Sequence, residues 1–158
     1  MKEIKLANGK GIALVDDADF EKVNQYKWKV STRYARHSYR EGKKIKGIQM
    51  HRFLLKAPIN MQVDHINGNG LDNRRSNLRL ATRSQNQWNT KRVNSKTGFK
   101  GVSYHNDTRR KKPWMAHITI YDKTRTVGHF YTAEEAARAY DKRAKELFGE
   151  FASTNFKQ

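Results

Sequence analysis

The sequence contains no cysteine, which excludes disulfide bonds and every zinc site that depends on cysteine ligands. It also has no apolar run that approaches the length of a membrane-spanning helix. The charged start, Met1-Lys-Glu-Ile-Lys5, is unlike a signal peptide. We therefore expect a protein that works in a reducing cytoplasm and has no membrane partner.

Acidic residues are scarce: 15 Asp and Glu stand against 33 Lys and Arg, which gives a formal net charge of +18 at pH 7. The basic residues are spread along the whole chain rather than gathered in one tail. Such a surface attracts polyanions, and its binding should weaken steeply with salt. A charge this large favours a nucleic-acid partner over a basic protein that has none. An anionic membrane is less favoured, because no amphipathic helix with a bulky apolar face is evident.

Only 36% of the 158 residues are hydrophobic, so the chain has little material for a large core. We expect an α+β fold, built from small units of strands with one or two helices. Residues 1–60 predict a strand-rich segment that begins with a hairpin at Asn8-Gly9, a pair that favours tight turns. Asp16-Asp17 can cap a short helix through Val23. The further expected elements are strands at 26–30, 34–39 and 45–50 and a helical turn at 51–55.

Residues 61–90 change character because they are rich in asparagine, which predicts a structured polar loop. Short apolar stretches frame the loop, at 61–63 before it and at 78–80 after it, and a helix over 83–91 is expected to follow. This segment therefore predicts the order strand, long loop, strand, helix. Residues 91–98 read as a basic linker.

Residues 99–158 predict a second unit, with three strands at 101–105, 114–121 and 124–130 and one helix. The helix is expected to begin after Thr132, where Glu135 completes a capping-box pattern, and Gly149 is typical of its end. We expect a three-stranded antiparallel sheet that packs on this helix and leaves its other face open.

The segment from Val63 to Asn86 carries the residue types that phosphodiester hydrolysis requires. Histidine can activate a water molecule near neutral pH. A hard divalent cation stabilises negative charge on the phosphate and the leaving oxygen, and it prefers oxygen ligands such as those of Asp and Asn. Asp64-His65 places such a ligand beside a base. Asn77 and Asn86 can return to the same point if the strands pair and the helix packs across them.

These residues lie in Asp64-His65, in Ser76-Asn-Leu-Arg79 and in Ser84-Gln-Asn86, and they follow Met50-His-Arg-Phe-Leu-Leu55. In order, spacing and residue type the pattern resembles the HNH nuclease family, specifically its phage and intron homing endonuclease branch. The family's fold is a ββα-metal motif, which agrees with the expected order of strands, loop and helix.

The resemblance implies a catalytic role for His65 as general base and for Asn77, which would brace the loop and fix the ring of His65. Asp64 and Asn86 would be the ligands of one Mg²⁺ or Mn²⁺ ion. The chain would then be a site-specific DNA endonuclease of the homing type, encoded by a phage or mobile element and active in the cytoplasm of a bacterial host.

Some assignments within this pattern stay open. Asn73 is an alternative to Asn77 for the middle position, and Asn69 is a weaker one. His51 can lie near the metal, but we first give it a structural role. The sequence does not decide between a monomer and a dimer.

The second unit carries Lys100-Gly-Val102, Trp114-Met-Ala-His-Ile118, Gly128-His-Phe130 and Ala133-Glu-Glu-Ala-Ala-Arg-Ala-Tyr-Asp141. With these segments it resembles the plant Apetala-type, ethylene-response-factor DNA-binding domain, in which the open sheet face lies in the major groove of double-stranded DNA. Most of the arginines and tryptophans with which that family reads bases are missing, so its GC-rich target is not implied. The expected DNA contacts are Lys91 and Arg92 of the linker, Arg109 and Arg110 of a hairpin loop, and Lys100, Ser103, His105, His117, Thr119, Thr124 and Thr126 of the sheet.

Two other functions are weighed against the nuclease. A DNA-binding regulator with a vestigial nuclease motif is the main alternative, and the complete set of Asp64, His65, Asn77 and Asn86 argues against it. An RNA-binding protein is less favoured, because the expected sheet lacks stacked exposed aromatic residues apart from Tyr121.

Overall fold

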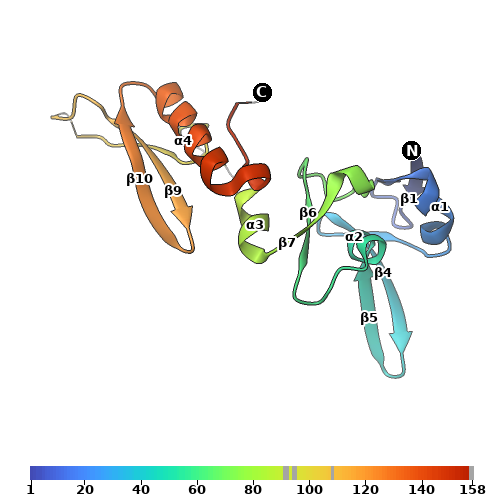
Figure 1. Cartoon of the computed structure of the whole chain (residues 1–158). Helices are drawn as coiled ribbons and strands as arrows, with labels where there is room; N and C mark the ends of the chain where they lie inside the picture. Colours follow the sequence, from blue (N-terminus) through green and yellow to red (C-terminus); the bar gives the residue numbers. More distant parts are fainter. Residues whose placement is uncertain (91–92, 94–95, 108, 157–158) are drawn as a thin grey trace. The chain divides into compact units, whose positions relative to one another are not determined.

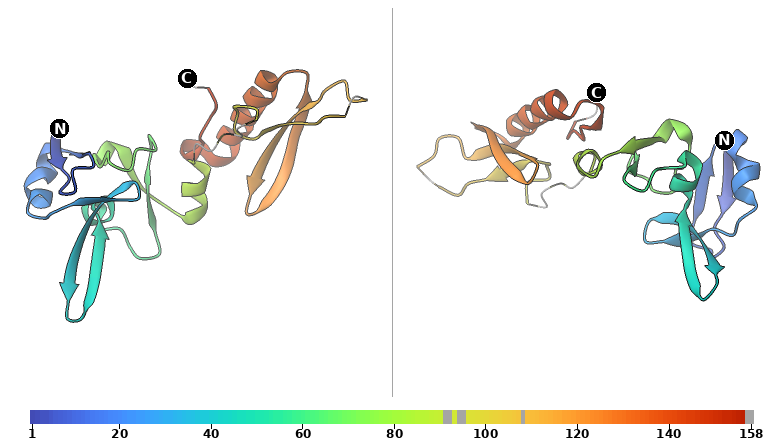
Figure 2. Two further views of the ribbon diagram at one scale, coloured as in Figure 1. Left: turned by 180° about the vertical axis from the view of Figure 1, so that it is seen from behind. Right: turned by 60° about the horizontal axis from the view of Figure 1, so that its bottom comes forward.

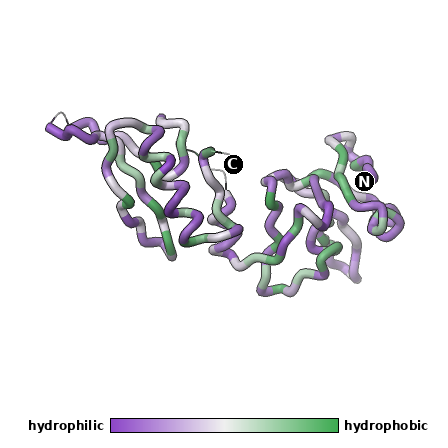
Figure 3. Tube along the Cα trace, turned by 45° about the horizontal axis from the view of Figure 1, so that its top comes forward, coloured by the Kyte–Doolittle hydropathy of each residue, from purple (hydrophilic) through white to green (hydrophobic). Residues whose placement is uncertain are grey.

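The computed structural model describes residues 1–90, 93, 96–107 and 109–156. These residues form ten β-strands and four α-helices in two compact units, Met1–Asn86 and Gln87–Gln158 (Figures 1 and 2). The strands pair into small sheets of two or three strands, so the expected mixture of helices with small sheets is confirmed. Apolar residues occur in short stretches between hydrophilic ones (Figure 3). None of the helices in the described part of the chain is long and apolar enough to cross a membrane.

Unit 1 begins with a hairpin of two antiparallel strands, β1 (Lys2–Lys5) and β2 (Ile12–Val15). The turn between them contains Gly9 at φ +66°, a left-handed conformation that glycine adopts without steric strain. The hairpin expected from Asn8-Gly9 is therefore confirmed.

Helix α1 (Asp17–Asn24) is tied to a distant part of the chain by two acidic side chains. Asp16 occupies the N-cap position, but its side chain makes no capping hydrogen bond, contrary to the expectation. Its carboxylate accepts a hydrogen bond of 2.7 Å from the backbone N–H of Arg75 instead. Asp19 is buried and accepts hydrogen bonds of 2.6 and 2.8 Å from the guanidinium of Arg75. These bonds hold the pKa of Asp19 below its usual value.

A three-stranded antiparallel sheet follows, in the order β3 (Lys29–Ser31), β4 (Tyr34–Glu41) and β5 (Lys44–Gln49). The first strand begins at residue 29 rather than 26, because the backbone N–H of Tyr26 still donates to the carbonyl of Val23 in the turn that ends α1. This sheet contributes two separate surfaces to unit 1, since side chains of each strand alternate between its faces.

Helix α2 (Met50–Leu55) starts directly after β5 and occupies the position of the expected helical turn. It ends at Lys56, which adopts the left-handed conformation at φ 47°. The guanidinium of Arg52 donates three hydrogen bonds of 2.8 to 3.1 Å to backbone carbonyls of residues 57, 58 and 61. Arg52 thereby fixes the turn that leads from α2 into the next strand.

Two short strands, β6 (Gln62–His65) and β7 (Leu78–Ala81), pair antiparallel with Asp64 opposite Arg79. Helix α3 (Arg83–Trp88) follows, so the structure has the expected order of strand, long loop, strand and helix. The helix ends before the expected residue 91.

The start of α3 has a local cause. The backbone N–H of Gln85 donates to the hydroxyl of Thr82 at 3.3 Å, and the side-chain carbonyl of Gln85 accepts from the backbone N–H of Thr82 at 2.8 Å. These reciprocal bonds are those of a capping box, which satisfies backbone donors that a helix start leaves without partners.

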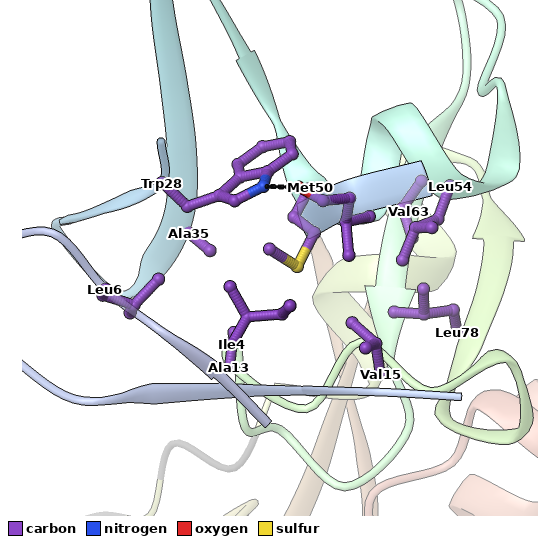
Figure 4. Packing of buried hydrophobic residues seen from close by; sticks show 11 residues of the cluster. Ile4, Leu6, Ala13, Val15, Trp28, Ala35, Met50, Leu54, Val63 and Leu78 are labelled. Atoms are coloured by element: carbon purple, nitrogen blue, oxygen red, sulfur yellow. Dashed lines mark hydrogen bonds between the residues drawn. The ribbon is translucent and has the colours of Figure 1, made fainter. Parts of the chain in front are cut away.

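One hydrophobic core joins β6 and β7 to the elements that precede them (Figure 4). Trp28 and Met50 are almost fully buried in it, and Val63 and Leu78 reach it from β6 and β7. The indole N–H of Trp28 donates to the carbonyl of Val23 at 2.8 Å, which satisfies its only polar group. The strands that carry Asp64 and His65 therefore share their core with the N-terminal segment.

The loop between β6 and β7 is closed by side-chain hydrogen bonds. The amide of Asn77 donates to the carbonyl of Asp72 at 2.8 Å and accepts from the backbone N–H of Asn67 at 2.9 Å. The carboxylate of Asp72, also buried, accepts from the side chains of Asn67 and Arg74 at 2.7 to 2.8 Å. The asparagine-rich sequence therefore makes a structured polar loop, as expected.

Unit 2 is an antiparallel sheet of β8 (Val102–Tyr104), β9 (Trp114–Ile120) and β10 (Lys123–Phe130), with β9 in the middle. Helix α4 (Ala133–Phe148) follows and begins with the expected capping box between Thr132 and Glu135.

The contact between α4 and the sheet is close because small side chains line it. Ala136, Ala137 and Ala144 of the helix are fully buried in one core with Ala116 and Ile118 of β9. The expectation that the helix covers this face of the sheet is confirmed.

Replacing Asp19 by Asn should lower the free energy of unfolding of unit 1 by about 1–3 kcal/mol at pH 7, because the buried carboxylate loses charge-assisted hydrogen bonds to Arg75. The folded-state pKa of Asp19 is lowered, so its contribution is complete above the ordinary value of 3.8 and is lost as the pH falls through the folded-state value. Urea titrations at neutral and at strongly acidic pH, followed by hydrogen exchange of unit 1 peptides, measure this difference.

The control is Glu146→Gln, which breaks the exposed pair with Arg143 on α4 and should change stability by less than about 0.5 kcal/mol. If Asp19→Asn lowers the free energy of unfolding in strong acid as much as at pH 7, the ionised Asp19 carboxylate is not the source of this stability.

Replacing Asn77 by Ala should open the loop, because the carbonyl of Asp72 and the backbone N–H of Asn67 each lose a partner. We expect the amide of Asn67 to exchange with solvent at least about tenfold faster, since a lost hydrogen bond is worth about 1–3 kcal/mol. Amide hydrogen exchange followed by NMR measures this directly. Asn69→Ala removes only an exposed turn contact with Leu71 and should leave the Asn67 amide protected; equal exchange in both variants would refute the role of Asn77.

Candidate active site

Asp64 lies in the middle of the β6–β7 pair and is only 3% exposed. Its carboxylate accepts a hydrogen bond of 2.9 Å from Nε of Arg79, which lies opposite on β7 and is also nearly buried, and the same oxygen forms an ion pair with Nη2 at 2.8 Å. A buried carboxylate of this kind needs a cationic partner. Arg79 belongs to the motif Ser76-Asn-Leu-Arg79, but the sequence assigns it no role, because only the strand register shows that it faces Asp64.

His65, the last residue of β6, is 5% exposed. Burial holds its pKa below the ordinary value, and the neighbouring charge of Asp64 and the side chain of Asn73 raise it in part. The ring is therefore neutral at pH 7 and can accept a proton.

Two other rings contact the ring of His65: that of Tyr34, which the sequence did not place in the site, and that of His51, to which it first gave a structural role. The ring of Tyr34 stacks on it at 5.6 Å between centroids, and the ring of His51 meets it edge-on at 4.9 Å. His51 is itself buried, which lowers its pKa to about 3, and its Nδ1 has no hydrogen-bond partner among the described residues. The motif Met50–Leu55 contained the signal for His51, but nothing in the sequence placed Tyr34 beside it.

The two asparagines considered for the middle position have different contacts. Asn77 braces the loop backbone through Asp72 and Asn67. Asn73 is fully buried, and its side-chain amide raises the pKa of His65. Both asparagines therefore stay candidates for the middle position.

Asn86 on α3 lies on the same side of β6 as Asp64. Its side-chain amide donates a hydrogen bond of 2.6 Å to the side-chain carbonyl of Gln62. Gln62 and Asp64 are two residues apart on β6 and therefore point to the same face, about 7 Å apart. His65 points to the opposite face, where Leu78 lies opposite it and joins the core.

Asp64 and Asn86 together offer carboxylate and amide oxygens. These are hard donors, which suit Mg²⁺ or Mn²⁺. Mg²⁺ is usually held by one or two protein ligands together with substrate phosphates, so two residues are enough. No group of three His, Cys, Asp or Glu side chains within the described ranges could hold a metal ion, and the Asp64–Asn86 pair is a smaller set of a different composition.

A hollow of about 450 Å³ adjoins Tyr34, on the side of the sheet away from the hydrophobic core. Arg36 and Arg52 line it together with Gln49. The guanidinium of Arg52 is engaged by three backbone carbonyls, so Arg36 is the arginine of this hollow that suits a phosphate group.

In unit 2, strand pairing gathers the expected sheet contacts on one surface, which we call the open face. Ser103 lies opposite Met115, His117 opposite Thr126, and Thr119 opposite Thr124. A shift of register after Thr126 adds His129, which also lies opposite Met115. The open face thus comprises Ser103, His105, Met115, His117, Thr119, Thr124, Thr126 and His129.

The open face carries polar atoms without partners. The hydroxyl of Ser103 and one ring nitrogen each of His105, His117 and His129 are buried without a hydrogen bond to any described residue. Burial and the nearby His105 lower the pKa of His117. Native proteins rarely leave such atoms unpaired, so these groups are available for hydrogen bonds to water or to a polar ligand.

The basic residues expected to contact DNA are placed differently from one another. The ammonium of Lys100 donates to the carbonyls of Trp88 and Thr90, both at 2.7 Å, and burial lowers its pKa to about 8. Arg109 and Arg110 both pair with Asp107. Lys91 and Arg92 lie outside the described residues.

Comparison with known proteins adds independent evidence. The HNH endonuclease family profile matches residues 56–88, which contain β6, β7 and α3. An uncharacterized HNH endonuclease of Acanthamoeba polyphaga mimivirus is 36% identical over 157 residues, covering 95% of this chain and 78% of the viral protein. Protein 3.8 of Escherichia phage T7 is 35% identical over 96 residues, covering 60% of this chain and 76% of the phage protein. No solved structure matches the chain.

The profile covers the segment that carries Asp64, His65, Asn77 and Asn86, and the viral relative matches along nearly the whole chain. On this evidence the protein belongs to the HNH endonuclease family.

Proposed function

We propose that the protein is a site-specific, metal-dependent DNA endonuclease of the homing type. The observation that carries this proposal is the placement of two neighbouring residues on β6. Asp64 points to the face that also bears Asn86, and His65 points to the opposite face. Phosphodiester hydrolysis by in-line displacement needs the attacking water and the leaving oxygen on opposite sides of the phosphorus atom, roughly in line. A phosphate at the end of β6 would meet that requirement.

His65 acts as the general base in this proposal. Its lowered pKa leaves the ring neutral at pH 7, so it can take a proton from a water molecule. Its orientation matters as much as its pKa, because the ring nitrogen must face that water. Tyr34 and His51 restrict the ring on two sides, and Asn73 acts on it from the loop.

Asp64 and Asn86 would hold one Mg²⁺ or Mn²⁺ ion, which supplies positive charge to the phosphate and the leaving oxygen. Arg79 fixes the carboxylate of Asp64 through a hydrogen bond and an ion pair. Groups that orient a metal ligand in this way contribute strongly to metal affinity. Asn77 contributes from further away, by keeping the loop between the two strands closed.

The remaining basic surface positions the DNA. We propose that the open face of unit 2 binds double-stranded DNA in the manner of the Apetala-type domain that it resembles. Its partnerless hydroxyl and ring nitrogens can bond to base edges or phosphates. Arg36 of the hollow beside Tyr34 would hold the DNA backbone near the cut. Lys100 serves the fold in this scheme, since its ammonium is engaged by two carbonyls.

By resemblance to the family, the products would carry a 5′-phosphate and a 3′-hydroxyl. The relatives come from a giant virus and a phage, which fits an enzyme that a phage or mobile element encodes and that acts in the cytoplasm of its host.

The His65→Ala variant should bind DNA like the wild type and cut it at least about a hundredfold more slowly, because a general base contributes about 10² to 10⁴ in rate. A plasmid pool that carries random genomic fragments, incubated with Mg²⁺ or Mn²⁺, measures both the rate and the positions of cleavage. If the wild type also fails to cut while both proteins show salt-sensitive binding, a DNA-binding regulator with a vestigial motif replaces the nuclease.

Asp64→Ala should abolish binding of one Mn²⁺ ion per chain, because the carboxylate is the only charged ligand in the proposed pair. Titration followed by electron paramagnetic resonance counts the bound ions in the wild type and the variant. Asp107→Asn removes an acidic group in unit 2 and should leave the binding unchanged. Retention of the ion by Asp64→Ala would show that the metal site lies elsewhere.

A further inference from the structure

Unit 1 has a second hollow, which we call the aromatic pocket. It has a volume of about 340 Å³ and is lined by Tyr26, Trp28, His37, Tyr39, Ile48 and Phe53. The residues come from the segment before β3, from β4 and β5, and from α2. Five of its six side chains are aromatic rings, in a chain where Phe, Trp and Tyr together make up only 11% of the residues.

The rings form a rigid wall. Trp28 is buried and anchored by its hydrogen bond to Val23. Tyr26 meets Trp28, His37 and Phe53 at centroid distances of 6.1, 5.1 and 5.3 Å, in tilted or edge-on contacts. The ring of Tyr39 lies almost parallel to that of His37, with an angle of 14° and 6.1 Å between centroids. These contacts fix the rings before any ligand arrives.

Two of these rings remain open to solvent: Tyr26 is 38% exposed and Tyr39 is 44% exposed. In a chain with a small apolar fraction, a gathered and exposed aromatic surface marks a binding site more often than a packing remnant. A cavity of about 150 Å³ already holds a benzene ring. The aromatic pocket therefore has room for a larger planar heterocycle.

The pocket is separate from the candidate active site. On β4, Tyr34 and Arg36 point to one face of the sheet, and His37 and Tyr39 point to the other. Helix α2 contributes to both sites from different sides: His51 contacts the ring of His65, and Phe53, two residues further along the helix, lines the pocket.

The charge around the pocket indicates the kind of guest. The ammonium of Lys22 lies 5.0 Å from the centre of the Phe53 ring. Lys46 lies opposite Tyr39 on β5, where it is ion-paired with Glu41. Aromatic cages also bind cations, but the net charge of +18 and Lys22 disfavour a cationic guest. A planar ring attached to an anionic backbone satisfies both the rings and Lys22.

His37 supplies a polar group inside this aromatic wall. Its Nδ1 donates a hydrogen bond of 3.0 Å to the carbonyl of Lys27, since a carbonyl can only accept. In the neutral ring Nε2 is then an acceptor. Such an acceptor can bind the exocyclic amine of an adenine, cytosine or guanine.

We propose that the aromatic pocket binds an unpaired nucleobase of single-stranded DNA, held by stacking on Tyr39 and Tyr26. A paired base cannot enter, because its faces are covered by its neighbours in the duplex. The pocket would hold a base that is unstacked near the cut, or one in a single-stranded stretch of the substrate. The proposal builds on DNA as the substrate of the proposed nuclease, and its test does not involve cleavage.

The test uses the full chain in the presence of EDTA, with a single-stranded oligonucleotide that carries one 2-aminopurine. Stacking on an aromatic ring quenches the fluorescence of this base. We expect quenching by the wild type, and an affinity about five- to a hundredfold lower for Tyr39→Ala, the range measured when one stacking ring is removed. Because Tyr39 is well exposed, this variant should fold normally, which circular dichroism verifies.

Two matched variants complete the experiment. Tyr39→Phe keeps the ring and should retain the affinity, and Tyr131→Ala removes a tyrosine that is 59% exposed in unit 2 and should have no effect. A duplex of the same sequence should compete poorly with the quenched complex. Unchanged affinity and quenching in Tyr39→Ala would overturn the proposal. If this variant instead changes only the sedimentation of the protein, a second copy of the chain occupies the pocket and the nucleobase proposal is wrong.

The outcome is distinguishable from that of the nuclease test. If the protein stacks 2-aminopurine on Tyr39 but does not cut DNA, the nucleobase proposal stands and the nuclease proposal is overturned. If the protein cuts duplex DNA and Tyr39→Ala binds the oligonucleotide like the wild type, the nuclease proposal stands and the nucleobase proposal is overturned.

Discussion

The ion pair between Asp64 and Arg79 is the contact on which the arrangement of the site depends. Both side chains are largely removed from water, and they meet across the two central positions of a very short sheet. Breaking such a pair leaves a charge buried without a partner, which is strongly unfavourable. The pair therefore opposes any slip of the register. A slip of one residue would send Asp64 toward the core and His65 away from Tyr34 and His51.

A two-stranded sheet is only marginally stable by itself, so β6 and β7 need support. They receive it from the N-terminal segment through the shared core around Trp28 and Met50. Arg75 adds a polar connection, because it joins the loop before β7 to Asp16 and Asp19 at the start of α1. The N-terminal residues are thus the scaffold of the site, and they also carry Tyr34 and His51 to the ring of His65.

The two units bring different chemistry to a chain of high positive charge. Unit 1 combines a buried constellation of Asp, His and Asn with a hollow that presents Arg36 and an aromatic pocket beside Lys22. Unit 2 offers a sheet face on which histidines and hydroxyl groups surround Met115. The positive charge of both units would attract a polyanion such as the DNA backbone at long range. The short-range contacts differ, with planar rings in one unit and hydrogen-bonding groups in the other.

The sequence by itself determined the order of the elements and the residues that define the candidate site. Adjacent and evenly spaced residues carry that information: the pair Asp64-His65, the loop asparagines, the Thr132–Glu135 capping box and the alternation of β9 all act locally. Local patterns predict which face of a strand or helix a residue occupies, but they do not predict which distant residue lies opposite it.

Only the tertiary structure decided those partners. The register of β6 and β7 placed Arg79 on Asp64, and the packing of α2 and β4 placed His51 and Tyr34 on His65. An irregularity after Thr126 reversed the alternation of β10 and brought His129 to the open face, where simple alternation predicts Gly128. Folding directs the ammonium of Lys100, which the sequence predicts as a DNA contact, to the carbonyls of Trp88 and Thr90. The physical reason is the same in each case: pairing and close packing join residues far apart in the chain, and their energies depend on the whole unit rather than on any short segment.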